Sequence, residues 1–312
     1  MKRILFLVMT LACVIYSYAQ SEKQSYIAMQ IVVEDVTEPF PTSAKAQLEA
    51  KLSTILTRNG VQSTNWQNQF FITAHVVPQT KDVLPGPPPQ VAEVMDVVFY
   101  IGDSYNQIVF ATETQTVRGV GTNDAKCYLN GLSNIKTNSS KLSAFVEEGK
   151  KKIIAYYDAQ APLMITKAKS LASMHDYEQA IWMMMTIPTE CKYYQEALDL
   201  GVEIYKDMLK YQCHQNLAAA KAAWVANYDK DGALAAAEYL SLIIPESGCY
   251  EEAEALSTEI KARMREDYEF EIRKYEDALG LKKDIIKTIR DIGVAYGMNQ
   301  KSYMNLGFLR RW

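Results

Sequence analysis

Three histidines are the side chains of this sequence best suited to bind a metal ion or to move a proton at neutral pH. They are His75, His175 and His214, and none of them stands at a spacing typical of a zinc site. No Gly-x-Ser-x-Gly turn and no metalloprotease helix occurs in the sequence. We therefore expect no catalytic residue, no metal ion, no cofactor and no enzymatic activity, and we expect His75, in an apolar stretch, to lie in the core.

A second chemical pattern is Gly119-Val120-Gly121, which stands between an expected strand and an expected helix. Exposed amides at a helix start attract anions, so two glycines there could bind a phosphate group. Asp124 takes the place of the third glycine of the dinucleotide-binding motif, and its charge would repel phosphate. The pattern therefore favours a tight turn from strand to helix.

Residues 227–238 are similar in spacing to a calcium-binding loop. Acidic residues stand at its third, fifth and twelfth positions, and Gly232 stands at the sixth. Asn227 replaces the first aspartate, however, and Ala235 offers no ligand at the ninth position. The sequence favours a plain turn between two helices and leaves calcium binding open.

The cysteines bear on the compartment and on stability. Cys13 lies in the expected leader, which leaves an even number of cysteines in the rest of the chain. Cys191 and Cys213 would lie at opposite ends of a helix of about 20 residues, about 30 Å apart, too far for a disulfide. Cys213 with Cys249 is the feasible pair, and the alternative is that the cysteines are free and buried.

The first 19 residues have the pattern of a secretory signal peptide, with cleavage expected before Gln20. A basic start precedes an apolar run of about a dozen residues, and small residues stand at the −3 and −1 positions. We therefore expect a periplasmic, cell-surface or secreted bacterial protein. The segment Leu11-Ala12-Cys13 offers an alternative, lipidation at Cys13, which is the one route to membrane tethering that we consider.

Composition and charge exclude several classes of protein. With 312 residues, 48% of them hydrophobic and 22% charged, the chain is neither collagen-like nor disordered, and its length favours two domains. Removing Lys2 and Arg3 with the leader leaves 31 of the 33 basic residues against 37 acidic ones, a net charge of −6. An acidic chain has no electrostatic reason to bind nucleic acid.

Residues 20–140 have the mixed pattern of an α+β sandwich domain, with helices against a mainly antiparallel sheet. Apolar residues alternate with others in four segments and recur at helical spacing in one, residues 44–56. The proline-rich segment 81–90 is expected to form a stiff loop between strands. The expected strands are 27–33, 68–77, 91–101 and 107–117, the last two joined by a hairpin at 102–106.

Residues 141–300 lose the strand pattern and are expected to form successive helices. Ile187-Pro188 and Ile244-Pro245 each end an apolar helix, and a cysteine and a similar Tyr-x-Glu-Ala segment follow each of them. Such internal similarity is typical of stacked helical units. The expected helices after the first one are 163–174, 176–187, 191–212, 214–228, 231–243, 249–279 and 282–296.

The segment 168–181 resembles a tetratricopeptide-type repeat, with small residues where paired helices touch and a tyrosine and an alanine on the second helix. The segment 219–245 is similar, with Trp224 and Tyr239. The resemblance implies an all-α helical-repeat domain, an α-solenoid, with a role in protein binding. An ordinary helical bundle is the alternative, and the 57-residue spacing departs from the usual period of about 34.

The segment Arg118–Ala125, a strand leading through small residues into a helix, resembles envelope proteins of the curli-secretion and penicillin-binding-protein-activator type. This resemblance implies a role through protein contacts at the bacterial envelope, without catalysis.

Taken together, these patterns predict a non-catalytic envelope protein that acts as an interaction or assembly scaffold for another envelope protein. One alternative is a carbohydrate-binding or hydrolytic protein that uses the loop 81–90 beside Trp66 and Tyr105. Another is a structural subunit of a fibre or secretion apparatus, in which the C-terminal tail 301–312 contacts a partner. The candidate contact residues of that tail are Phe308, Leu309 and Trp312.

Overall fold

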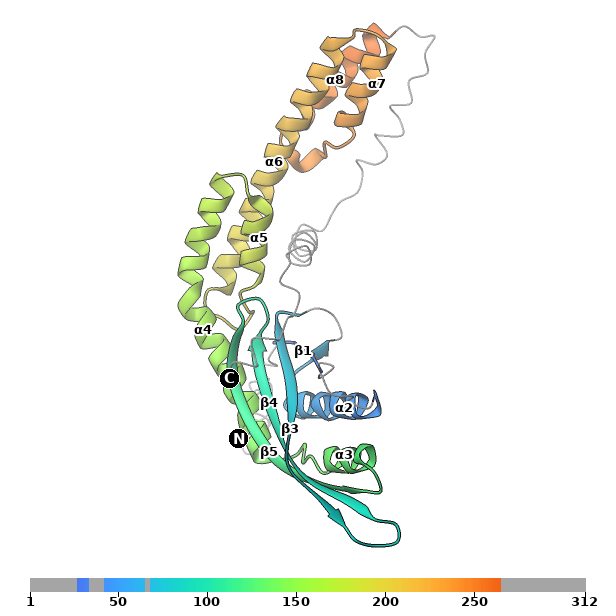
Figure 1. Cartoon of the computed structure of the whole chain (residues 1–312). Coiled ribbons are helices and arrows are strands. Elements are labelled where there is room, and N and C mark those ends of the chain that lie inside the picture. The colour runs from blue at the N-terminus through green and yellow to red at the C-terminus, as the bar shows by residue number, and fades with distance from the viewer. Residues whose placement is uncertain (1–26, 34–41, 65–67, 265–312) are drawn as a thin grey trace, which may run out of the picture. The chain divides into compact units, whose positions relative to one another are not determined.

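The computed structural model describes residues 27–33, 42–64 and 68–264 (Figure 1). The leader 1–19 with Cys13, Trp66, the expected helix 282–296 and the tail 301–312 lie outside the described residues. The described chain forms two compact units, and the division between them falls between Tyr156 and Tyr157, inside a single helix. No helix in the described ranges is long and apolar enough to cross a membrane.

The first unit is built on a mixed five-stranded sheet with the order β2-β1-β3-β4-β5. The first strand pairs in parallel with the second and third, and the three long strands pair antiparallel as two successive hairpins (Figure 1). The strand predicted at 68–77 is thus the central one. The strands are β1 (Met29–Ile31), β2 (Ser63–Thr64), β3 (Phe70–Leu84), β4 (Gln90–Asp103) and β5 (Ile108–Gly121).

The predicted hairpin at 102–106 joins β4 to β5, and a glycine and an aspartate shape it. A side chain at Gly102 would come within 2.6 Å of the Ile108 carbonyl oxygen and of the Phe71 ring, so only glycine fits there. Asp103 Oδ1 accepts hydrogen bonds from the backbone N–H groups of Tyr105 (2.8 Å) and Asn106 (2.9 Å), which closes the turn.

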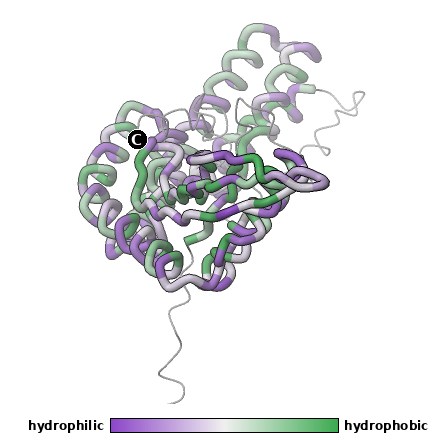
Figure 2. The backbone as a smooth tube through the Cα atoms, turned by 60° about the horizontal axis from the view of Figure 1, so that its bottom comes forward, coloured by the Kyte–Doolittle hydropathy of each residue, from purple (hydrophilic) through white to green (hydrophobic). Residues whose placement is uncertain are grey.

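Three helices follow or precede the long strands: α2 (Thr42–Arg58), α3 (Asp124–Ser133) and α4 (Ser140–Ser173). Hydrophobic and hydrophilic residues follow one another along the strands in Figure 2. The alternate β4 residues Met95, Val97, Phe99 and Ile101 are all fully buried on one face. Helix α3 contacts this face at Met95 through Gly131, and helix α4 contacts it at Phe99 through Phe145, with ring centroids 6.4 Å apart.

The opposite face of the sheet stays partly open to solvent. Its β5 column, Thr112, Thr114 and Thr116, is exposed, and so is His75 on β3. The expectation that His75 lies in the core is therefore wrong. Its apolar neighbours in the sequence face the helices, whereas an antiparallel sheet commonly leaves its other face to water.

The proline-rich segment forms a shorter loop than expected. Residues 81–84 pair with β4 down to Leu84 opposite Gln90, so only residues 85–89 lie between the strands. The prolines end the pairing because they lack an N–H group, but the four residues before them keep theirs. Val83 and Leu84 are exposed in this extension.

The second unit is helical. Helix α5 packs against the first half of α6, and α7 and α8 pack against its second half (Figure 1). The core of the second half contains Leu217, Trp224, Ala236 and Ile260, all nearly inaccessible to solvent. The elements are α5 (Tyr177–Met185), α6 (Tyr194–Ala226), α7 (Lys230–Leu240), the short 3-10 helix η1 (Pro245–Ser247) and α8 (Tyr250–Arg263).

The prediction of an all-α helical-repeat domain, an α-solenoid of tetratricopeptide type, is wrong. The protein is α+β as a whole, and its described helices do not form a repeated two-helix unit. Helix α6 runs unbroken over 33 residues through Cys213, where the sequence analysis ended one helix and began another. No glycine or proline interrupts the chain between Gly201 and the end of α6, so nothing there stops the helix. Helix α6 therefore contains residues of both predicted repeats, which are not separate units.

Candidate functional site

The candidate site is a cleft of about 440 Å³ in the second unit, where the end of α4 and the start of α5 meet the side of α6. The cleft is open to solvent, and Leu200 and Ile204 of α6 are its buried apolar residues. We call it the α6 cleft. Its polar lining residues are Lys169 and Ser173 of α4, Tyr177 of α5, and Glu203, Asp207, Lys210, Tyr211 and His214 of α6.

Helical spacing explains why one side of α6 carries this lining. Residues three, four or seven positions apart share a helix face, and Glu203, Asp207 and Tyr211 follow one another at intervals of four. All three are exposed, in contrast to Met208 and Cys213, which point into the packed side of the same helix. The exposed side chains of the stripe are thus free to meet a ligand.

The turn between α4 and α5 places a histidine against this stripe. The N–H of Asp176 donates to the Leu171 carbonyl oxygen (2.9 Å), which closes the end of α4. His175 adopts the left-handed backbone conformation, with φ of 64°, at the position that glycine usually takes after a helix. In this conformation its ring stacks on Tyr211, with centroids 4.3 Å apart and planes 24° apart.

Tyr177 completes a group of three rings, which we call the aromatic cluster of the cleft. Its ring lies 5.7 Å from that of His175 and 5.8 Å from that of Tyr211, centroid to centroid. Burial, the nearby Asp207 carboxylate and Tyr211 raise the pKa of the Tyr177 hydroxyl. The hydroxyl therefore stays protonated at neutral pH and can donate a hydrogen bond.

His214 lines the cleft and His175 stacks on Tyr211 beside it, but the two histidines have no arrangement typical of a metal site. His175 belongs to the aromatic cluster and His214 lies one turn of α6 beyond Tyr211. Within the described residues no group of three or more side chains from His, Cys, Asp and Glu could hold a metal ion. Rings beside carboxylates and amines suit the binding of a charged or polar group. The sequence analysis did not identify this cleft, although the four-residue spacing on α6 was a usable signal.

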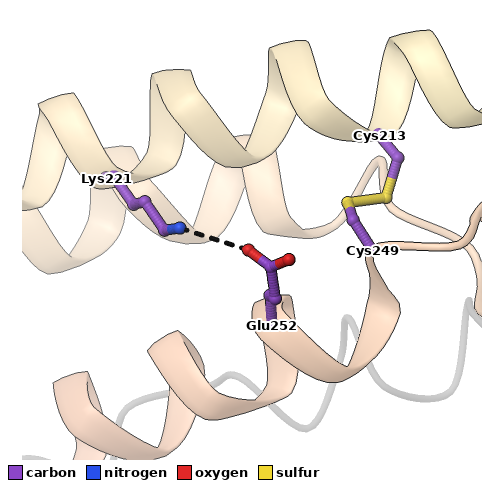
Figure 3. A network of polar contacts seen from close by, with 4 residues as sticks. All are labelled: Cys213, Lys221, Cys249 and Glu252. Atoms are coloured by element: carbon purple, nitrogen blue, oxygen red, sulfur yellow. Dashed lines mark hydrogen bonds and ion pairs between the residues drawn. A yellow bond between two sulfur atoms is a disulfide. The ribbon is translucent and has the colours of Figure 1, made fainter.

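The cysteine pair that the sequence favours is bonded in the structure. Cys213 and Cys249 form a disulfide with Cα atoms 5.9 Å apart (Figure 3). Ser247 Oγ donates a 2.8 Å hydrogen bond to Cys213 Sγ. The expected helices 191–212 and 214–228 place Cys213 between two helices, but it lies inside α6. The bond forms because α8 begins beside the middle of α6 and packs along it, where Lys221 and Glu252 also approach to 3.4 Å.

The Gly119-Val120-Gly121 segment permits close packing of helix α3 on strand β5. A Cβ atom at Gly119 would overlap the Cys127 carbonyl oxygen, and one at Gly121 would overlap the Cys127 nitrogen. The helix start is capped by Asn123, whose Oδ1 accepts a 2.9 Å hydrogen bond from the Lys126 N–H. The two glycines therefore allow the backbone of α3 to pack directly on the backbone of β5 at this junction between strand and helix.

The segment similar to a calcium loop is folded as the start of a helix. Asp229 caps α7 by accepting hydrogen bonds, each 3.0 Å long, from the N–H groups of Asp231 and Gly232. A side chain at Gly232 would overlap the Asn227 carbonyl oxygen, which accounts for the glycine. Because α7 begins at Lys230, the later loop positions lie within a helix, and only residues 227–229 form the turn between α6 and α7.

The loop and the tyrosine of the carbohydrate hypothesis lie apart. Residues 85–89 precede β4 and Tyr105 follows it. A strand of 14 residues separates them, and at about 3.3 Å per residue a strand of this length extends over about 45 Å. Tyr105 therefore cannot act beside the loop 81–90 within one chain.

The first unit holds a buried carboxyl group beneath α3. Glu93 of β4 is 9% exposed, and burial raises its pKa; the positive charge of Lys81 offsets part of this rise, and the Asp124 carboxylate adds a smaller increase. Lys81, opposite Glu93 in the sheet, pairs with Asp124 at 2.8 Å. Burial also raises the pKa of the Cys127 thiol, so this cysteine stays protonated at neutral pH and is a poor nucleophile.

We expect Glu93→Gln to stabilise the protein at pH 8 and to lose this effect toward pH 4. The folded-state pKa of Glu93 lies above the ordinary value of 4.5, so its ionisation costs stability. The contribution of Glu93 to wild-type stability should be most favourable below about pH 4.5, where the group is protonated in both states. This contribution should fall as the pH rises through the folded-state pKa. Thermal melting of both forms between pH 4 and 8 measures the difference.

The control for this experiment is Glu113→Gln on β5, which removes the same charge from a half-exposed side chain. Its melting temperature should track that of the wild type across the range. Equal destabilisation by Glu93→Gln at pH 4 and pH 8 would contradict the assigned role of burial.

Comparison with known proteins adds little to this picture. No family model matches the sequence, and no curated protein matches it. A crystal structure of a minor lipoprotein from Acinetobacter baumannii is similar over 41% of this chain and 85% of its own length, with 20% identical residues and a TM-score of 0.22. At this TM-score the similarity carries no argument about fold or function.

Proposed function

We propose that the protein is exported to the bacterial envelope and there binds another envelope protein through the α6 cleft, without catalysing a reaction. The observation that carries this proposal is the aromatic cluster of His175, Tyr177 and Tyr211 at the open cleft. Tyrosine rings offer a large contact area at low cost in side-chain entropy and are enriched at the centres of protein interfaces. The stacking on His175 holds Tyr211 in place before a partner arrives, which lowers the cost of binding.

Two features support the envelope as the location. The first 19 residues have the pattern of a secretory signal. The Cys213–Cys249 disulfide suits an oxidising compartment such as the periplasm or the cell exterior. The resemblance of residues 118–125 to envelope proteins that act through protein contacts agrees with both. Contact through the tail residues Phe308, Leu309 and Trp312, and lipidation at Cys13, stay predictions.

We expect a photo-crosslinking amino acid in place of Met174, beside the cleft, to trap a discrete partner in the envelope of the producing cell. Met174 is 65% exposed and precedes His175 in the sequence. Adding Tyr211→Ala should reduce the yield of the conjugate at least about tenfold, because aromatic residues at an interface centre often contribute 2 kcal/mol or more. Mass spectrometry of the conjugate identifies and quantifies the partner.

The matched control is Tyr239→Ala on α7, which removes an equally exposed tyrosine outside the cleft, 40% exposed against 37% for Tyr211. A second control places the crosslinker at Leu234 of α7. Equal conjugate yields with Tyr211→Ala and Tyr239→Ala, or the same conjugate from Leu234, would refute binding at the cleft.

A further inference from the structure

We propose that the α6 cleft holds a basic side chain of the partner protein, seated between the carboxylate of Asp207 and the rings of Tyr177 and Tyr211. This inference rests on the proposed function and names the chemistry that the partner must bring.

The negative charge of the cleft is available to a ligand. Glu203 and Asp207 lie one turn apart on the exposed side of α6. Neither carboxylate makes an ion pair or a side-chain hydrogen bond with another residue of the described ranges. A cation arriving there would thus meet carboxylates that no lysine or arginine of the described chain already occupies.

Two rings converge on the same place. Asp207 and Tyr177 line the same cleft, and Asp207 lies one turn of α6 before Tyr211. The Tyr177 and Tyr211 rings are 5.8 Å apart, centroid to centroid, at an angle of 51°. The faces of aromatic rings attract cations, and ammonium or guanidinium groups commonly lie within about 6 Å of a ring centroid. Rings set at an angle beside a carboxylate form part of a cage for such a group.

The molecule makes the same contact with its own basic residues. The Arg263 guanidinium lies 4.8 Å from the centroid of the Tyr228 ring, and the Lys192 ammonium lies 4.8 Å from that of Tyr193. Tyrosines of this chain thus accept cations on their faces. Arginine is the better match for the cleft, because its planar group can stack on a ring while it donates two hydrogen bonds to a carboxylate.

Lys169 and Lys210 also line the cleft and set a limit on where a cation can sit. Their two positive charges balance the two negative charges of Glu203 and Asp207, so the cleft as a whole has no net attraction for cations. Selection must therefore come from the local arrangement at Asp207 and the two rings. Substitution of a lysine therefore distinguishes the two kinds of ligand, because the binding of an anion would depend on the lysines and the binding of a cation would not.

The test titrates the full protein with Nα-acetyl-arginine amide and follows the backbone amide signals of α5 and α6 by NMR. We expect saturable shifts near Tyr177 and Tyr211 with a Kd of about 1–10 mM, which is reasonable for one small group. Asp207→Asn should weaken binding by roughly fivefold to tenfold, because it removes the charge and keeps the shape. The matched control is Glu196→Gln, which removes one charge from α6 outside the cleft and should leave the Kd unchanged.

Two other probes decide the nature of the ligand. Nα-acetyl-norleucine amide has a similar chain without a charge, and Nα-acetyl-glutamate amide has the opposite charge. Equal binding of the norleucine probe would overturn the role of charge. Tighter binding of the glutamate probe, lost in Lys210→Ala, would show an anion site and also overturn the proposal.

The crosslinking experiment separates this inference from the function on which it rests. If the partner is trapped at Met174, depends on Tyr211 and is unaffected by Asp207→Asn, the protein-binding role stands and the basic side chain is wrong. If the arginine probe binds as expected but no partner is trapped, the cation seat stands and the protein-binding role fails.

Discussion

Gly119→Ala should destabilise the first unit by about 3 kcal/mol or more, enough to prevent stable folding of a marginal domain. The added methyl group would overlap the carbonyl oxygen of Cys127, a backbone atom held within α3, and would press on the Gly131 nitrogen 3.0 Å away. A flexible side chain could move aside, but two backbones packed against each other cannot separate without losing the contact between helix and sheet. Thermal melting followed by circular dichroism measures the loss.

The control for this substitution is Gly86→Ala in the proline-rich loop. A methyl group there would lie 3.6 Å from the Pro88 carbonyl oxygen, an ordinary contact, so the melting temperature should not change. A Gly119→Ala protein as stable as the wild type would mean that α3 does not pack on β5 as closely as the structure shows.

Removal of the Cys213–Cys249 disulfide should cost about 3–4 kcal/mol of stability in the second unit, because the bond closes a loop of 36 residues and restricts the unfolded chain. The bond also ties the start of α8 to the middle of α6, around a core that contains Trp224 and Ile260. We expect the double variant Cys213→Ala, Cys249→Ala to lose helical signal at a clearly lower temperature than the oxidised wild type.

Reductant supplies the control. Dithiothreitol should lower the melting temperature of the wild type toward that of the double variant and leave the double variant itself unchanged. Burial and the nearby Asp158 raise the pKa of the remaining Cys191 thiol to about 12, so this cysteine should not react with reductant or oxidant at neutral pH. A wild type that melts identically with and without reductant would contradict a stabilising role for the bond.

Local patterns predicted the elements of the first unit well, because they act over a few residues. Alternation gave the strands around the hairpin at 102–106, and helical spacing gave residues 44–56 of α2. Residues 81–84 were assigned to a loop because prolines follow them, although their own amides were free to pair. Whether a strand continues depends on the strand beside it, and the sequence does not say how far that partner extends.

In the second unit, by contrast, local patterns predicted the arrangement of the helices poorly. Similar short segments after Ile187-Pro188 and Ile244-Pro245 predicted repeated units. The first segment begins the 33-residue α6, whereas the second follows the 3-10 helix η1 and begins the 14-residue α8. Similarity over ten residues therefore did not extend to the helices around them. The length of α6 follows from what is missing in the sequence, namely any residue that ends a helix near Cys213.

The sequence by itself determined most of the helices and strands, because backbone hydrogen bonding, side-chain periodicity and turn chemistry are local. Only the tertiary structure decided that α8 brings Cys249 to the middle of α6 and that the turn after α4 stacks His175 on Tyr211. Tyr177 and Tyr211 are far apart in the chain, and their meeting depends on how α5 packs on α6. Contacts of this kind arise from the burial of apolar surface between whole elements, which no spacing of residues along one segment specifies.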